Sequence, residues 1–249
     1  MKTIWTDRTD STNSEAFRRL GDLPSLCVLA AREQTAGRGQ RGNSWFSEPG
    51  KNLTFSIVLR FGPAACPPLP ATDAFWLNYL ISDVSARFLE QLGVPCAIKW
   101  PNDLYVRGRK ICGILIENRL AGEDLETAVI GTGININQAD FPQLANATSV
   151  LQYTGREHEL NACLDRLCAV FEEELPLLYD EEGRQRLFDA YSRRLFRKGI
   201  SAEYHDLRED RRYRGVIEGI GQDGRLCVRD LDAGGCLRRY AFKEISYLL

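Results

Sequence analysis

The chain has 249 residues, of which 44% are hydrophobic and 27% are charged. This composition predicts one large folded core, or a large domain with a small one, and it excludes disordered, collagen-like and coiled-coil proteins. The 32 basic and 34 acidic residues give a net charge of −2, so no overall field attracts nucleic acid or an anionic membrane.

Apolar runs and the start of the chain bear on localisation. No run approaches the roughly 20 apolar residues that cross a bilayer, and the first residues contain no signal-peptide pattern. We therefore expect a cytoplasmic protein.

Short apolar segments and polar turns alternate in the first quarter of the chain. Residues 4–6, 26–31 and 52–61 are predicted strands. Thr12 and Glu15 have the spacing of a capping box, which predicts that a helix begins there. Residues 33–50 are rich in Gly, Arg and Gln without apolar periodicity, and so long a loop in a compact domain indicates function.

The rest of the chain completes a predicted α+β fold. Helical periodicity covers residues 72–92, four strands follow near 96–100, 104–106, 110–118 and 125–133, and helices are expected at 157–180 and 183–196. From residue 199 the pattern changes to short strands and Gly turns, typical of a small β-barrel. We predict a mixed β-sheet with flanking helices in residues 1–197 and a C-terminal β domain in residues 198–249.

The eight cysteines are dispersed and form no Cys-x-x-Cys pair, and only two histidines are present. Structural zinc needs clustered thiolate or imidazole ligands, so we expect buried free thiols instead.

The long loop contains Gly37-Arg38-Gly39-Gln40-Arg41-Gly42, which matches the letters of a dinucleotide-binding fingerprint. That fingerprint must open a helix, and residues 43–51 are not helical, so we reject this interpretation. A glycine loop with two arginines is suited to closing over a phosphate or carboxylate. Taken alone, it would more often be a solvated basic loop.

Three further stretches carry polar groups at the ends of strands. Lys99-Trp100-Pro101-Asn102-Asp103 places a lysine, an amide and a carboxylate around one turn, and Lys110 begins an otherwise apolar strand. In residues 130–137, two glycines allow close approach of a ligand, and Asn135 follows them. Each stretch alone has a structural explanation: an Asx turn, a surface lysine or a capped strand end.

Together with Asp10-Ser11-Thr12-Asn13, these motifs, in their order and spacing, closely resemble those of the biotin–protein ligases. The resemblance covers nearly the whole chain. It implies a class II synthetase-like biotin/lipoate ligase catalytic domain and an SH3-like C-terminal barrel. It also implies that the enzyme uses ATP and Mg²⁺ to activate biotin as biotinyl-5'-AMP, and transfers it to a lysine of the carrier domain of acetyl-CoA carboxylase or another biotin-dependent carboxylase.

The resemblance also implies the site residues. The catalytic residues would be Lys110, Arg38 and Asp103. Biotin would contact Ser11, Thr12, Asn13, Gln34, Arg38, Gly39, Gln40, Lys110 and Gly113. ATP and the adenylate would contact Arg38, Arg41, Trp45, Lys99, Asn102, Lys110 and Asn135. No metal ligand is predicted, because Mg²⁺ would be bound mainly through the phosphates.

Residue chemistry agrees with this assignment. The ureido ring of biotin needs donors and acceptors, which Ser11, Thr12, Asn13 and Gln34 provide. Its valeryl chain needs an apolar slot, which Gly113, Ile114, Gly131 and their strand neighbours would form. Lys110 would hold the biotin carboxylate and then the acyl-phosphate link. Asp103 would act as a base towards the carrier lysine, would orient it, or would serve structure alone.

Two alternatives belong to other classes. Lipoate or octanoate transfer uses a related fold, although the glycine loop and the Lys-Trp-Pro-Asn-Asp stretch favour biotin. A biotin-binding regulatory protein would need DNA contact. Because the first ligase motif begins at residue 10, we expect a monofunctional ligase without an N-terminal DNA-binding domain, and a homodimer stays open.

Overall fold

The computed structural model describes residues 1–62, 66–142, 144, 146–221 and 223–248. A seven-stranded mixed sheet forms the larger part, in the order β1-β2-β3-β7-β6-β5-β4. β1 and β2 are parallel and the other neighbours are antiparallel. The strands are β1 (Lys2–Thr9), β2 (Leu26–Gln34), β3 (Leu53–Arg60), β4 (Ala97–Lys99), β5 (Asp103–Val106), β6 (Arg109–Ala121) and β7 (Asp124–Ile134).

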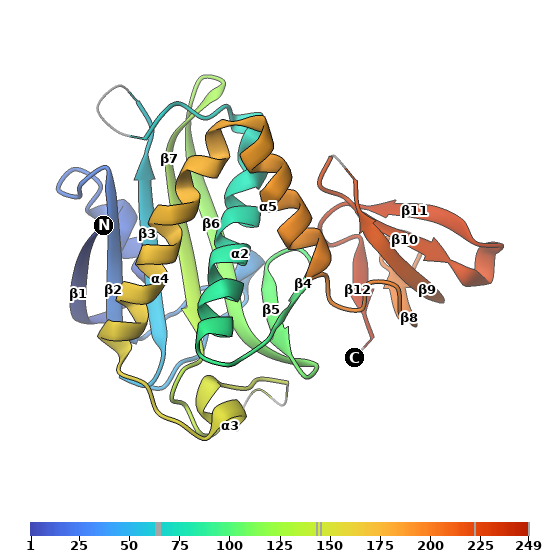
Figure 1. Cartoon of the computed structure of the whole chain (residues 1–249), viewed down its shortest axis with the longest axis horizontal. Coiled ribbons are helices and arrows are strands. Elements are labelled where there is room, and N and C mark those ends of the chain that lie inside the picture. Colours follow the sequence, from blue (N-terminus) through green and yellow to red (C-terminus); the bar gives the residue numbers. More distant parts are fainter. Residues whose placement is uncertain (63–65, 143, 145, 222, 249) are drawn as a thin grey trace.

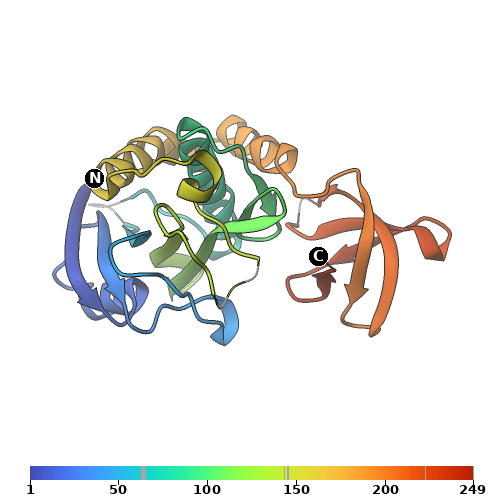
Figure 2. The ribbon, with the colours of Figure 1, turned by 90° about the horizontal axis from the view of Figure 1, so that it is seen from below.

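Three helices cover one face of this sheet, as Figures 1 and 2 show: α2 (Phe75–Gln91), α4 (Leu160–Glu174) and α5 (Glu181–Arg193). The predicted helix at 157–180 is shorter than expected, because a 3₁₀ turn (Leu175–Tyr179) containing Pro176 replaces its end. Helix α1 (Thr12–Arg18) packs on the opposite face, and α3 (Val150–Thr154) was not predicted. Further 3₁₀ turns cover Gln40–Gly42, Ala71–Asp73 and Leu231–Ala233.

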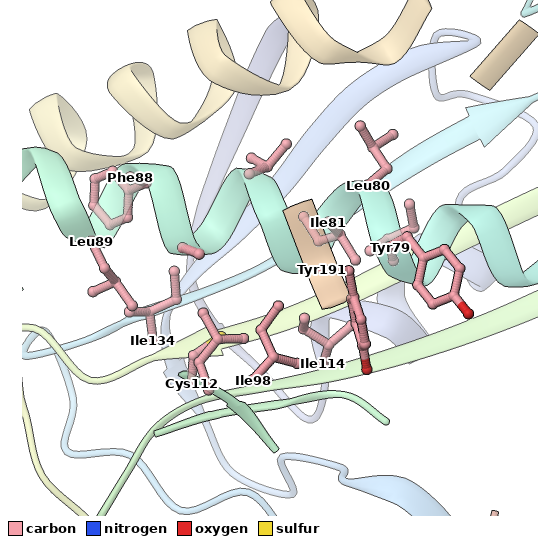
Figure 3. Packing of buried hydrophobic residues seen from close by; sticks show 14 of the residues in the cluster. Tyr79, Leu80, Ile81, Phe88, Leu89, Ile98, Cys112, Ile114, Ile134 and Tyr191 are labelled. Atoms are coloured by element: carbon pink, nitrogen blue, oxygen red, sulfur yellow. The ribbon is translucent and has the colours of Figure 1, made fainter. Parts of the chain in front are cut away.

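Strand periodicity separates the two faces of the sheet. On β3, Phe55 and Ile57 join the core under the helices, whereas Ser56 and Val58 face α1. Figure 3 shows Leu89 of α2 pointing towards Ile134 of β7. The confirmed α+β fold thus has one closed, apolar face and one face left open to ligands.

The start of α1 differs from the prediction. Ser11 occupies the N-cap position without a side-chain cap, and Thr12 is the first helical residue. The carboxylate of Glu15 pairs with Arg18 instead of the helix start. The capping box was therefore wrong, because the hydroxyl of Thr12 is used elsewhere, in a contact with Ser56.

The second sheet is antiparallel, in the order β11-β10-β9-β8-β12. Its strands are β8 (Ser201–Asp206), β9 (Arg211–Ile220), β10 (Leu226–Asp230), β11 (Cys236–Tyr240) and β12 (Ile245–Tyr247). It lies beside β4 and β5 in Figure 1, where the indole Nε1 of Trp100 donates to the backbone oxygen of Gly224 at 3.2 Å. The predicted boundary at residue 197 falls between α5 and β8 and stays a prediction.

Two smaller expectations concern membranes and thiols. Over the described residues, no helix is both long and apolar enough to cross a membrane. The eight cysteines are free, and six of them are buried.

Candidate active site

A cavity of about 330 Å³ opens on the face of the sheet that carries α1. Its wall combines the start of α1, the glycine loop, strands β4 to β7 and the edge of the second sheet. The predicted site residues that line it are Ser11, Thr12, Asn13, Gln34, Arg38, Gly39, Gln40, Trp45, Lys99, Asn102, Asp103, Lys110 and Gly113. Ile114 and Gly131, near the predicted apolar slot, also line it.

One end of the cavity is a buried cluster of short polar side chains at the start of α1. The backbone N–H of Thr12 donates to the side-chain oxygen of Gln34 at 2.8 Å, which joins α1 to the end of β2. The hydroxyl of Ser56 lies 2.8 Å from the hydroxyl of Thr12 and 2.6 Å from Oδ1 of Asn13. Donors and acceptors therefore stand in fixed directions, as recognition of a neutral polar ring requires.

Glu117 and Arg38 extend this cluster along β6. The side-chain amide of Asn13 donates to the Glu117 carboxylate at 2.8 Å, and the Arg38 guanidinium forks onto the same carboxylate at 2.7 and 3.1 Å. Arg38 is therefore ion-paired in this structure rather than free to meet a ligand.

A second ion pair occupies the β5–β6 hairpin. Lys110 Nζ lies 2.7 Å from the Asp103 carboxylate, and strand pairing places Asp103 opposite Gly113. A Cβ on Gly113 would lie 3.1 Å from Lys110 Nζ, so the lysine crosses directly over the glycine. The hairpin thus positions a cation and a carboxylate together over a stretch of bare backbone.

Two glycines make room for an aromatic ring beside this pair. Gly113 and Gly133 are opposite each other in neighbouring strands, and an added Cβ on either would overlap the indole of Trp45. Lys110 Nζ lies 5.6 Å from the centre of that ring, within cation–π range. The glycine requirement is therefore steric: the ring of the loop residue rests on the sheet itself.

Lys99 lies deeper, between two tyrosines. Its Nζ is 3.3 Å from the hydroxyl of Tyr105 and 5.2 Å from the ring centre of Tyr247, which belongs to the second sheet. Burial lowers the pKa of Lys99. Asn102, next to it, donates its amide to the backbone oxygen of Ile114, which fixes the turn before β5.

Two polar atoms of the glycine loop point inward without a partner. Among the side chains that the structure describes, Gln40 Oε1 and Trp45 Nε1 are buried and make no hydrogen bond. Buried polar groups are normally satisfied, so these two mark where a ligand would supply partners.

Two predicted residues are not placed at the cavity. The Asn135 side chain lies outside the lining as described, and its amide donates to the backbone oxygen of Thr148 at 2.9 Å. The prediction that Asn135 reaches the phosphates or ribose has no support from this geometry, because its amide already bonds the chain that follows β7. The side chain of Arg41 lies outside the described residues.

Sequence reasoning missed two residues that bond to the cavity wall from outside its lining, and a further part of the wall itself. Ser56 sits inside an apolar strand, and only its place on the α1 side of the alternation hints at its role. Glu117 lies in the predicted strand 110–118 but received no function. The second sheet adds Leu207, Phe242, Lys243, Ile245, Ser246 and Tyr247 to the wall, which no local motif indicates.

The chain is similar in sequence to known proteins. The model of the biotin/lipoate A/B protein ligase family matches residues 5–135. The bifunctional ligase/repressor BirA of Escherichia coli is 32% identical over 243 residues, covering 95% of this chain and 71% of that protein. The biotin–[acetyl-CoA-carboxylase] ligase of Paracoccus denitrificans is 32% identical over 240 residues, covering 89% of this chain and 92% of that protein.

A solved structure has a similar fold. The biotin protein ligase from Aquifex aeolicus, in complex with biotin and ATP, has a TM-score of 0.76 and 23% identity, and the match covers 98% of this chain and 97% of that one. The resemblance inferred from the motifs is confirmed, as is the prediction of a ligase enzyme. The chain belongs to the biotin/lipoate A/B protein ligase family.

Proposed function

We propose that the protein activates biotin with ATP as biotinyl-5'-AMP and transfers it to a lysine of a biotin carboxyl carrier domain. The observation that carries the proposal is the Lys110–Asp103 pair over Gly113, in one cavity with the polar cluster of α1. A ligand with a neutral polar ring at one end and a carboxylate at the other would meet the polar cluster and the cation in this one cavity. The relatives named for biotin ligation support the choice of biotin.

In the first step, a carboxylate oxygen of biotin attacks the α-phosphorus of ATP, and pyrophosphate leaves. Lys110 would neutralise first the carboxylate and then the new acyl-phosphate oxygens. Mg²⁺ would accompany ATP through its phosphates and supply further charge neutralisation. Asp103, a carboxylate that lines the cavity, is engaged by Lys110, so we assign the metal no protein ligand.

In the second step, the ε-amine of the carrier lysine attacks the carbonyl carbon of the mixed anhydride, and AMP leaves. The amine must lose a proton, and Asp103 is the proposed acceptor or the group that orients the amine. Trp45, which rests on Gly113 and Gly133, would cover the adenylate and exclude water. The cytoplasmic location and the lack of DNA binding stay predictions, and a homodimer stays open.

Pyrophosphate exchange into ATP tests the proposal. Exchange should require biotin and should yield biotinyl-AMP by mass spectrometry; exchange driven equally well by lipoate or octanoate would overturn the assignment. Lys110→Met should abolish exchange, whereas Lys2→Met, an exposed lysine of the edge strand β1, is the matched control and should retain it. Adding a biotin carrier domain should then produce one biotinylated lysine.

A further inference from the structure

Glu117 has no part in the reaction as proposed, yet it joins two segments of the cavity wall. It follows Gly113 and Leu115 on the open face of β6, and its side chain is 26% exposed. Its carboxylate accepts hydrogen bonds from Asn13 at the start of α1 and from Arg38 at the start of the glycine loop.

On the α1 side, the carboxylate fixes the direction of an amide. Asn13 uses both amide hydrogens, one towards Glu117 and one towards the backbone oxygen of Leu115 at 3.2 Å. Its oxygen then faces Ser56, whose hydroxyl lies 2.6 Å away. A Cβ on Gly131 would overlap the Asn13 side chain, so the amide is also held sterically.

On the loop side, Glu117 holds the base of a small hairpin. Arg38 and Ser44 form an antiparallel bridge, Gly39 N–H donates to the backbone oxygen of Asn43 at 2.7 Å, and Trp45 N–H donates to that of Gly37 at 2.8 Å. The guanidinium fork of Arg38 onto Glu117 is the ion pair that attaches this hairpin to β6. A forked, charge-assisted contact defines direction as well as distance.

We propose that Glu117 is a positioning residue that makes Asn13 and Arg38 one hydrogen-bonded unit, and that Arg38 acts as the anchor of the glycine loop rather than as a free cation for phosphate. Biotin recognition at α1 and closure of the loop then depend on the same carboxylate. Beyond this anchor lies the tip of the loop, residues 40–43, which carries Gln40. This inference rests on the proposed function for the identity of the ligands, biotin and ATP. The contacts of Glu117 do not depend on that function.

A double-mutant cycle separates an anchor from a direct phosphate contact. Glu117→Gln, Arg38→Gln and the double variant should each raise the Kd for biotin by about tenfold or more, the scale of a charge-assisted contact, and the double variant should be no worse than either single variant. The proposal is overturned if Arg38→Gln raises the KM for ATP while Glu117→Gln changes neither the Kd for biotin nor the KM for ATP. Additive losses would overturn it as well.

The matched control is Asp232→Asn. Asp232 also pairs with an arginine, but beside the second sheet: Nε and Nη2 of Arg214 donate to its Oδ1 at 3.0 and 2.9 Å. This variant loses a comparable ion pair and should leave biotin and ATP binding unchanged. An equal loss of biotin affinity in the control would mean that the measurement reports general loosening, which would contradict the specific role of Glu117.

Hydrogen exchange in the protein without ligand gives an answer that does not depend on biotin. Glu117→Gln should speed exchange of the Gly39 and Trp45 amides by about tenfold while amides in α2 keep their rates. Unchanged loop exchange would refute the anchor even if biotin affinity fell. Should the wild-type protein fail to bind biotin, the proposed function fails, and the exchange result still decides the role of Glu117.

Discussion

On the face of the seven-stranded sheet covered by helices, charged side chains lie between α2, α4 and α5, whereas on the open face they line a cavity. Asp83 of α2 and Glu174 of α4 are buried, with Arg194 3.1 Å from Asp83 and Arg87 paired with Glu174. The side chains of Lys110 and Asp103 are 32% and 24% exposed. We infer that charges on the first face affect stability, and those on the second affect ligands.

The largest effect on stability should come from the helix-covered face. Phe88 on α2 is fully buried in the core shown in Figure 3. Phe88→Ala should lower the free energy of unfolding by about 3–5 kcal/mol, because it removes buried apolar surface and leaves a cavity. Denaturant titration measures this loss. The kcat of the folded fraction should be unchanged, and a large fall in kcat would show that the two faces are coupled.

Lys110→Ala should have the opposite profile. Its ion pair with Asp103 is partly exposed, and such pairs contribute about 0–1 kcal/mol, so the thermal midpoint should move little. Adenylation should fall at least about 10²-fold, the scale for removing one positioned electrostatic group. The two measurements are the melting temperature and biotin-dependent pyrophosphate exchange. Normal adenylate formation by the Lys110→Ala variant would show that Lys110 is only a surface lysine.

A pH titration of stability probes the buried carboxyls. Burial raises the pKa of Glu174 to about 7, from a usual value of 4.5, and burial also raises the pKa of Asp83. The folded chain therefore holds protons that the unfolded chain has released, so stability should fall as the pH rises from about 4.5 to about 7.

Glu174→Gln should flatten this dependence, because the amide cannot ionise. Glu173→Gln is the control: the neighbouring carboxylate also pairs with Arg87 at 3.1 Å, but its side chain is 66% exposed. Thermal midpoints between about pH 5 and pH 8 distinguish the variants, with about 2–4 °C expected for each kcal/mol. A slope that survives Glu174→Gln would place the titrating group elsewhere.

The features carried by strands could be predicted from the sequence, because the local pattern of apolar, polar and turn residues determines them. Period-2 alternation and turn residues located the strands along the chain, and Lys110, expected at the start of such a strand, lines the cavity. The capping box failed for a tertiary reason: the Thr12 hydroxyl turns towards Ser56, which is 44 positions away in the sequence.

Long-range pairing limited the prediction of the site. Glu117 meets Arg38 across 79 positions, and nothing near Glu117 in the sequence indicates a partner. The second sheet contributes to the wall through its packing beside β4, which no motif encodes. Asn135 follows two glycines in a ligand-like pattern, yet its amide binds the backbone of Thr148. The sequence pattern thus predicted which strands form the site, but not which polar side chains are already bonded to other parts of the chain.

The smallest expected effect concerns the tip of the glycine loop, where Gln40 carries a neutral amide. Gln40 can offer biotinyl-AMP one neutral hydrogen bond, so Gln40→Gly should speed its dissociation by about fivefold, or about 1 kcal/mol.

Arg38→Ala removes the charged fork onto Glu117 and should weaken retention two to three times more in free energy. Dissociation rates of biotinyl-AMP from the two variants decide between the tip and the base of the loop. If Gln40→Gly releases the adenylate faster than Arg38→Ala does, the tip holds the intermediate and Arg38 is not the anchor. Because both residues line the open face, neither variant should shift the pH dependence that the buried carboxyls give to stability.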